Sequence, residues 1–316
     1  MSTFQWQFDA PSGVYKNHKL SAQLREASIA ETKFMQFVRP EPGYGKKMGE
    51  SINITRISNI SVPSSSLLEE NVRIPEDSIT LSTQAITVAE NGRSVPFTSF
   101  AEDLSHIDLR NAVQRQLRRQ LSLSLDIDAA TAFKAGQIKA IPDGISSLTF
   151  DTDGTPSTAA TVNLNVYHVE QIRDYMFSTL NIDPAVGDDY IFMIATKAKR
   201  GLMSDPAWSD WKKYTDPSAK FNGEVGRIEN MRFIEVNHTS ALSGSKGTGS
   251  VLGEGVAFGS DAVVMASAED PELRAKMADD YGRSQGVAWY GVYAYGQIWS
   301  DSANAGEARV VHLTSS

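Results

Sequence analysis

Cysteine is absent from all 316 residues of the sequence. This excludes disulfide bonds, thiol nucleophiles, iron–sulfur clusters and cysteine-ligated zinc, so packing and hydrogen bonding must hold the fold. Long apolar runs are also missing, since no stretch approaches the ~20 residues of a membrane-spanning helix. Residues 1–13 have neither the basic start nor the apolar core of a signal peptide. We therefore expect synthesis in the cytoplasm and no membrane partner.

Lysine is absent between Met48 and Phe133. Up to Asp103 this stretch favours strands but holds few apolar residues, and it then runs into an arginine-bearing amphipathic pattern. A two-stranded ribbon this polar cannot build a core and is marginal in water by itself. We therefore expect the ribbon to lie on another surface, which we take to be a neighbouring copy of the same chain.

Positive charge is in deficit, because 30 Lys and Arg face 38 Asp and Glu for a net charge of -8. This balance argues against a protein that grips nucleic acid through a basic surface. The composition, 41% apolar and 22% charged, is that of an ordinary soluble protein, and the length suffices for one large or two modest domains.

Alternating apolar residues predict a long β-ribbon. Its two strands would run over 52–62 and 79–88, with changes of phase that indicate bulges or twist. Residues 63–70 form a polar, turn-prone tip. The Asn91–Gly92 pair predicts a tight turn before a return strand at 95–97.

A long helix follows the ribbon. Ser105 and Asp108 have the spacing of a capping box, which predicts that the helix starts there. An apolar stripe then repeats every four residues, and with its extension to Phe133 the helix would be ~40 Å long before Gly136 ends it. The stripe consists of Leu109, Val113, Leu117, Leu121 and Leu125.

The remaining segments predict a second, α/β portion. Residues 143–161 are turn-rich, 243–255 form a Gly/Ser-rich loop expected to be mobile, and 268–283 are polar. Residues 17–38 fit either an N-terminal arm with a hinge at 40–43 or the first helix of a compact domain. The expected regular elements are a helix over 166–180 capped by Asn165, and strands at 190–195, 223–228, 231–236, 286–299 and 308–313.

A search for catalytic or metal sites is negative. The five histidines, His18, His106, His168, His238 and His312, occur singly, without the spacing that places two ligands on one helical face. Residues 247–253 come near a dinucleotide fingerprint but follow a Gly/Ser linker instead of a buried strand. Asp151–Thr155 could start a calcium loop, yet no glutamate stands at its twelfth position. We expect no cofactor and no metal.

Aromatic residues near a carboxylate leave one enzymatic alternative. Trp208, Trp211, Tyr214 and Glu224 could line a sugar cleft, as in a soluble carbohydrate-active hydrolase. The simpler interpretation, which we prefer, is that the tryptophans pack a helix onto a sheet.

The order of arm, ribbon, long helix, α/β portion and return strands resembles the major capsid (coat) protein of tailed bacteriophages, which has the Hong Kong phage coat fold. Short motifs similar to those of its large podovirus-like family lie at Gly223–Glu235, Val256–Ala262, Gly282–Arg283 and Val287–Tyr290. The likeness extends over nearly the whole chain.

The resemblance implies an α+β fold with five parts. Residues 1–47 would be the N-terminal arm and 48–104 the extended β-hairpin loop. Residues 105–161 would form the peripheral domain with its spine helix, 162–264 the axial domain, and 265–316 the strands that return to the peripheral domain.

The resemblance also implies a non-enzymatic function. The chain would assemble with itself, as hexamers and pentamers, into the icosahedral shell of the virion and enclose double-stranded DNA without reading its sequence. Scaffolding and portal proteins would be partners, and a decoration protein is possible. A bacterial nanocompartment shell, which has the same fold, is the nearest alternative.

Charged residues supply a hypothesis for the contact between subunits. Some relatives join subunits by isopeptide bonds from a lysine of the extended loop, and the missing lysines close that route here. We expect carboxylates of the ribbon to meet arginines on a neighbour's helix, since arginine offers planar, multi-donor pairing. The carboxylates are Glu69, Glu70, Glu76 and Asp77, and the arginines are Arg110, Arg115, Arg118 and Arg119.

Overall fold

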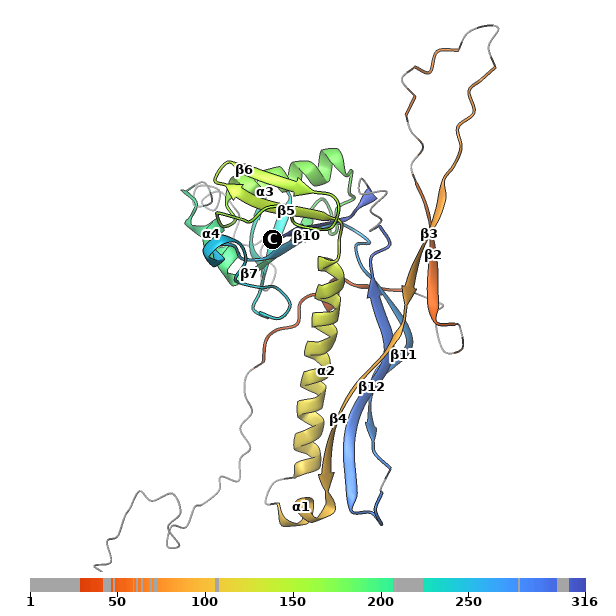
Figure 1. Ribbon diagram of the computed structural model, residues 1–316, viewed down its shortest axis with the longest axis vertical. Coiled ribbons are helices and arrows are strands. Elements are labelled where there is room, and N and C mark those ends of the chain that lie inside the picture. The colour runs from red at the N-terminus through yellow and green to blue at the C-terminus, as the bar shows by residue number, and fades with distance from the viewer. Residues whose placement is uncertain are drawn as a thin grey trace, which may run out of the picture.

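The protein is described by a computed structural model covering residues 29–41, 47, 49–58, 60, 62–63, 65–68, 70, 73–105, 108–206, 208, 224–277, 279–299 and 307–316, with the side chains of 224 and 225 excepted. A globular portion sits at one end of a long helix, and a narrow ribbon projects from the opposite side (Figure 1). None of the helices in these ranges is long and apolar enough to span a membrane.

Seven strands form the larger sheet, in the globular portion. In spatial order they are β6 (Ser147–Asp151), β5 (Ile138–Gly144), β13 (Val310–Leu313), β10 (Gly255–Phe258), β7 (Tyr190–Ala195), β9 (Met231–Val236) and β8 (Glu224–Ile228). β13 pairs in parallel with β5, and β7 with β9, whereas the other neighbours are antiparallel. The strands predicted at 190–195, 223–228, 231–236 and 308–313 are all present, within two residues of the expected bounds.

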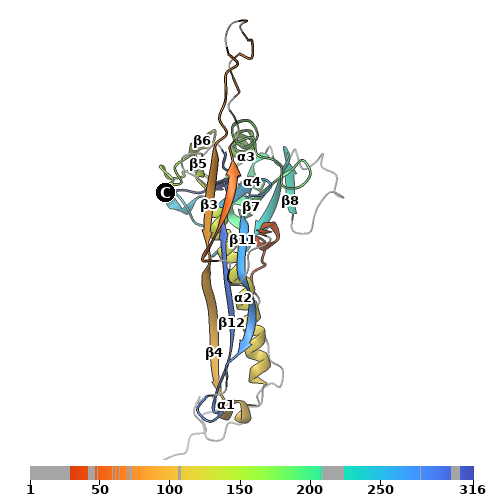
Figure 2. The same ribbon diagram turned by 90° about the vertical axis from the view of Figure 1, so that its right-hand side faces the viewer.

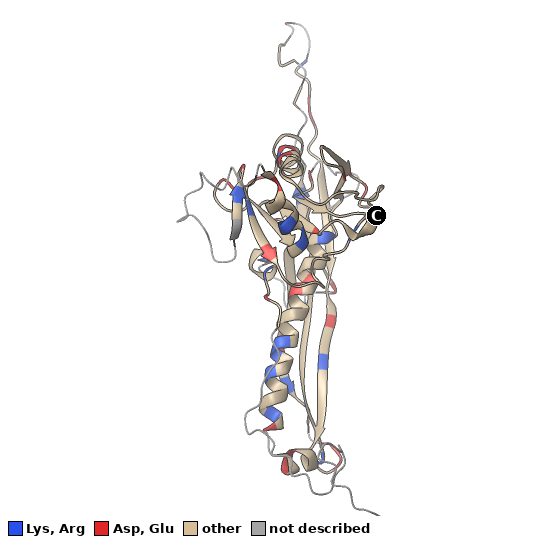
Figure 3. Ribbon diagram, turned by 90° about the vertical axis from the view of Figure 1, so that its left-hand side faces the viewer, with Lys and Arg blue, Asp and Glu red and all other residues tan. Residues whose placement is uncertain are grey.

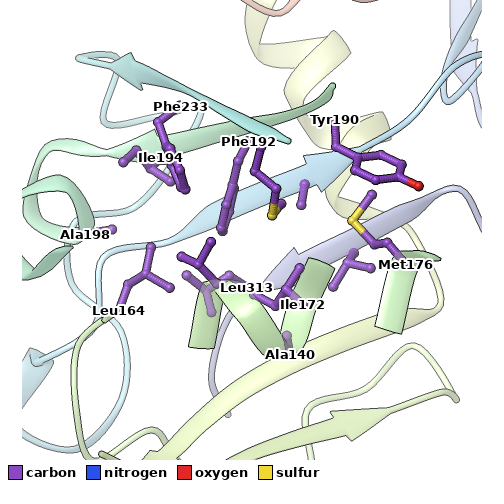
Figure 4. Close-up of a cluster of buried hydrophobic side chains, with 14 of the residues drawn as sticks. Ala140, Leu164, Ile172, Met176, Tyr190, Phe192, Ile194, Ala198, Phe233 and Leu313 are labelled. Carbon is purple, nitrogen blue, oxygen red and sulfur yellow. The ribbon is translucent and has the colours of Figure 1, made fainter. Parts of the chain in front are cut away.

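Both faces of this sheet are covered, which explains why β7 is apolar at every position. Phe192 and Ile194 point toward α3 (Val166–Asp174), its π-helical extension η2 (Tyr175–Thr179) and α4 (Thr196–Ser204), as Figure 4 shows. Ile191 and Met193 face the opposite core, which contains the end of the long helix. Asn165 caps α3 as predicted, with its side chain accepting from the His168 amide.

The long helix α2 (Leu109–Lys134) packs on a second sheet. Its strands, in order, are β1 (Arg39–Pro40), β11 (Val264–Ala275), β12 (Ser284–Gly296) and β4 (Ala89–Thr98). Figure 2 shows β4, β12 and β11 side by side with α2 behind them. Leu117 of the predicted stripe is buried against Val287 and Trp289, so the amphipathic pattern was interpreted correctly.

The predicted capping box at the start of α2 is wrong. A separate helix, α1 (Ser99–Leu104), precedes it, and Ser105 is the C-cap of α1. The N-cap of α2 is Asp108, whose side chain accepts a 3.0 Å hydrogen bond from the Asn111 amide. The helix ends at Lys134, close to the predicted stop at Gly136.

The predicted turn at Asn91–Gly92 is also wrong, because β4 runs straight through both residues and pairs with β12. Gly92 is required there by a close approach: a Cβ atom on it would lie 2.8 Å from the Trp289 carbonyl oxygen. The change in the alternation of apolar residues near residue 86 reflects a change of pairing partner. β2 (Ser51–Ile57) and β3 (Leu81–Thr87) pair without a register shift, and the chain then changes partner from β2 to β12.

Three segments whose composition was noted as turn-rich, polar or Gly/Ser-rich are structured. Residues 143–161 include β6, and 268–283 include much of β11. The loop 243–255, predicted to be mobile, is tied down by amide hydrogen bonds from Thr248 to the Ala160 carbonyl (2.9 Å) and from Gly253 to the Asn163 side chain (3.2 Å). The helix-like pattern over 17–28 lies outside the described residues.

Candidate subunit interface

The base of the ribbon is fixed to the body of the subunit. Ile86 is buried with Val264 and Ala266 of β11 and Ile298. The Arg56 guanidinium, 3% exposed, donates at 2.7 Å to the Ser82 hydroxyl on the paired strand and at 2.7 Å to the Ile298 carbonyl. A buried charge is costly unless its hydrogen bonds are made, so the ribbon is held where Arg56 can reach both acceptors. Arg56 therefore fastens the ribbon to the carboxyl-terminal part of the chain.

Beyond the Ile57–Leu81 pair the ribbon leaves the body and points away from it (Figure 1). Large apolar side chains in this part are exposed, because a two-stranded ribbon has no core of its own in which to bury them. They are Ile57, Ile60, Val62, Leu67, Leu68, Ile74, Ile79 and Leu81, with exposures from 50% to 92%.

The predicted acidic residues lie on this projecting part. Glu70, Glu76 and Asp77 are exposed, and Glu76 pairs with Arg73 on the same ribbon. Glu69 lies outside the described residues. Within one subunit the projecting part of the ribbon lies at the far end of the molecule from the amino-terminal half of α2 (Figure 1).

Figure 3 marks Lys and Arg positions in blue along the amino-terminal half of α2, the part that holds the predicted arginines. Arg115 and Arg118 are exposed and Arg119 is half-exposed. Arg110 donates at 2.9 Å to the Gln285 side chain and lies 3.9 Å from the Glu102 carboxylate of α1. The structure of a single chain therefore presents the two charged sets on separate surfaces and does not bring them together.

A segment near the amino terminus is anchored to α2 by one carboxylate. Asp126 is fully buried, and its Oδ1 accepts from the backbone amides of Lys33 (2.9 Å), Phe34 (2.8 Å) and Met35 (3.4 Å). The Phe34 ring then packs on Phe133 with ring centroids 5.6 Å apart. The other oxygen, Oδ2, lies 3.8 Å from His238 Nδ1. Asp126 thereby fixes where the amino-terminal segment crosses the subunit.

Buried charges join the end of α2 to the larger sheet. The His312 ring connects Glu254 Oε1 (2.8 Å from Nε2) with Lys139 Nζ (3.2 Å from Nδ1). Lys139 can only donate and a carboxylate only accepts, so the neutral ring carries its proton on Nε2. Burial lowers the pKa of His312 and lowers that of Lys139 to about 8. Burial alone would raise the pKa of Glu254, but the hydrogen bond from His312 and the nearby Lys134 lower it overall.

The histidine and tryptophan considered for a metal site or a sugar cleft have structural surroundings. His168 caps α3, and no cluster of three or more metal-ligating side chains occurs in the part of the chain that is described. Trp208 is buried edge-on against Phe233, 5.7 Å between ring centroids, and its ring also contacts Gly226. Trp211 and Tyr214, the other aromatic residues of the suspected sugar cleft, lie outside the described residues.

Asp126, Arg56 and Glu254 were missed by sequence reasoning. Their partners lie far away in the chain, as with Asp126 and Phe34, 92 residues apart. The sequence held one local signal. Asp126 is a charged residue on the same turn of the helix as the small, buried Ala129 and Ala130.

Comparison with known proteins gives a consistent result. A sequence model of the family described as phage capsid protein matches residues 81–305. No curated protein matches the sequence. Solved structures similar to this chain, each 14% identical to it, include a cyanophage Pam1 capsid subunit (TM-score 0.69, covering 98% of this chain and 99% of that one), the capsid of Ralstonia phage GP4 (0.67; 100% and 99%) and the capsid of Helicobacter pylori bacteriophage KHP30 (0.68; 99% and 100%). At this identity they establish a common fold.

Proposed function

Because the chain belongs to the phage capsid protein family and is a major capsid protein of a bacteriophage shell, we propose that its ribbon is the arm by which each subunit holds its neighbour. The observation that carries this proposal is a ribbon fixed at its base by Arg56 whose projecting part exposes apolar side chains. The base of such a segment is held in place, but no surface in the described part of one subunit covers the apolar residues beyond it. A second copy of the chain supplies that surface.

We assign the parts of the subunit accordingly. Residues 1–47 are the N-terminal arm, whose short strand β1 joins the four-stranded sheet, and 48–88 are the extended loop, since β4 pairs with β12 in that sheet. The spine helix α2 and the four-stranded sheet form the peripheral domain, and the seven-stranded sheet forms the axial domain. β5, β6 and β13 then belong to the axial domain, because they hydrogen-bond within its sheet, and the sequence-based boundaries shift to match.

The charged residues give the contact its specificity. We infer that the ribbon's carboxylates at 69–70 and 76–77 approach the arginines of a neighbour's α2. Each exposed pair contributes only ~0–1 kcal/mol, so the effect comes from repetition around a closed ring. The rings would be hexamers and pentamers in an icosahedral shell.

The remaining partners follow from the proposed place in the virion. The shell would assemble in the host cytoplasm with scaffolding and portal proteins, and a decoration protein would be a possible addition. It would enclose double-stranded DNA, and the net charge of -8 supports an inner wall along which DNA slides without sticking. We infer a structural role without catalysis or cofactor.

The contacts between subunits are proposed to be non-covalent, since the ribbon has no lysine to form an isopeptide bond. Purified particles boiled in detergent should give one band at the mass of the single chain, 34.5 kDa. A ladder of covalent multimers would contradict this part of the proposal.

The test of the main proposal is assembly. The purified full chain, alone or expressed with the phage's assembly proteins, should elute as megadalton particles or as capsomers and show closed shells by negative-stain microscopy. Nuclease-protected DNA inside particles from infected cells would separate a virus shell from a nanocompartment with protein cargo. Elution only as a small oligomer under every condition would refute the proposal that the ribbon holds a neighbouring subunit.

A further inference from the structure

An open cavity of about 730 Å³ lies between the amino-terminal segment and the larger sheet. Ile191 of β7, Ile234 of β9, Ser122 of α2, Ile29 and Val186 are among the residues that line it, together with the charged Glu31, Lys33 and Arg232. Ile29 is 46% exposed and Val186 40% exposed. This groove is a concave, mainly apolar surface with charged residues in its lining, and the described part of the subunit leaves it open.

The groove continues into the arginine-bearing face of α2. Arg118 and Arg115 precede Ser122 by four and seven residues, and these spacings place all three side chains on one side of a helix. Both arginines are exposed, whereas Lys33 in the lining of the groove is already paired with Glu31 at 2.9 Å. An apolar seat thus lies next to a cationic strip, so a complementary ligand has apolar residues followed by a carboxylate.

The ribbon tip has that pattern. Leu67 and Leu68 are 88% and 57% exposed, and Glu70 follows two residues later. Two residues of extended chain span ~7 Å, and the four residues between Arg118 and Ser122 rise ~6 Å along α2. Leucines placed in the groove beside Ser122 therefore bring Glu70 to Arg118.

We propose that this groove is the docking site for the ribbon tip of a second copy, with Leu67 and Leu68 in the groove and Glu70 on Arg118. The inference rests on the proposed function and specifies where the ribbon binds. In Figure 1 the ribbon strands β2 and β3 lie on the opposite side of α2 from β7, which contributes Ile191 to the groove, so a ribbon points away from its own groove. The contact is heterologous, and repeating it around an axis closes a ring.

Because the chain has no cysteine, the docking can be tested by disulfide cross-linking without background from native thiols. The double variant Leu68→Cys with Ser122→Cys places one thiol on the ribbon tip and one in the groove, and a disulfide requires their Cα atoms to come within ~7 Å. Assembled particles treated with a mild oxidant should give a ladder of linked subunits on a non-reducing gel, which a reductant removes. The matched control is Leu68→Cys with Met277→Cys, because Met277 is 91% exposed in the turn between β11 and β12, far from the groove.

The outcomes separate the two proposals. Wild-type chain that never forms particles overturns the proposed function, and the docking with it. Particles of the Leu68/Ser122 variant that give no ladder, or no more than the Leu68/Met277 control, overturn the docking alone.

A second measurement covers the case in which the double variant does not assemble. Hydroxyl-radical footprinting of unmodified protein should show a several-fold drop in oxidation of Leu67, Leu68 and Ile29 when free subunits become particles. Oxidation of Met277, which lies outside the groove, should stay unchanged if the drop is specific to the groove. Equal oxidation of the two leucines in free and assembled protein would rule the docking out.

Discussion

The Asp126 carboxylate in the spine helix accepts a 2.8 Å hydrogen bond from the backbone amide of Phe34, 92 residues earlier in the chain. The same oxygen also accepts from Lys33 and Met35, so one side chain satisfies three consecutive amides. Carboxylates that accept several amide hydrogen bonds act as strong fixed anchors. The path of the amino-terminal segment is therefore determined by a residue of α2.

Asp126→Ala should release this segment. An unsatisfied buried amide costs about 1–3 kcal/mol, so we expect a lower melting temperature and faster tryptic cleavage after Lys33. Asp126→Asn keeps an oxygen acceptor and should show a smaller effect. Asp103→Ala, an exposed carboxylate on α1, is the surface control. Equal cleavage of the Asp126→Ala and Asp103→Ala proteins would contradict the anchoring role.

Arg56→Met should loosen the ribbon while the body stays folded. The change keeps an apolar stem but removes the hydrogen bonds to Ser82 and Ile298. Loss of hydrogen bonds from a charged group costs about 1.5–3 kcal/mol, which corresponds to roughly 10- to 150-fold faster amide exchange in β2 and β3. Hydrogen–deuterium exchange measures this directly. Arg93→Met, at an exposed position of β4, should leave the ribbon's exchange unchanged.

Reversing the charge on the spine helix should block assembly without unfolding the subunit. In Arg118→Glu with Arg119→Glu, the ribbon's carboxylates would meet like charges, and the penalty recurs at every subunit of a ring. Adding Glu69→Arg and Glu70→Arg should restore particles, as judged by electron microscopy. Normal shells from the doubly reversed helix alone would eliminate this electrostatic contact.

Lys139 predicts a rise of stability in mildly alkaline solution. Burial lowers its pKa in the folded subunit to about 8, whereas the unfolded chain titrates near ~10.4. Between these values the unfolded state binds more protons, so the unfolding free energy increases with pH. Below pH 8 both states are protonated and the cost of the buried ammonium is present in full. Urea unfolding of free subunits at pH 7 and pH 9.5 should show this increase for the wild type but not for Lys139→Met, and parallel changes in the two proteins would refute it.

The spacing of apolar residues predicted helices and strands correctly wherever the same face of a segment is buried along its whole length. β7 was predicted with its observed bounds because both of its faces are buried, and α3 was predicted because Asn165 and its apolar spacing agree. The stripe on α2 identified the contact at Leu117 in the same way. Local sequence describes such segments well, since every residue experiences the same kind of surroundings.

Local signals failed where a distant partner decided the structure. Asn91–Gly92 has the chemistry of a tight turn, yet the Trp289 carbonyl leaves room only for glycine in a continuous strand. The 243–255 loop has a flexible composition but makes specific hydrogen bonds to residues 160 and 163. Arg56 and Asp126 are ordinary charged residues in sequence, and only the folded chain reveals their acceptors and donors. The acidic ribbon and basic helix were identified by charge alone, and one subunit cannot bring them together.

The place of β13 in the larger sheet affects the timing of synthesis. This strand, at residues 310–313, lies between β5 and β10, in the interior of the sheet. Its partner β5 is made about 170 residues earlier, so β5 must wait for its neighbour while most of the chain is translated. Until residues 310–313 have been translated, β5 and β10 lack the strand between them, so the larger sheet of a nascent chain stays open until β13 is made.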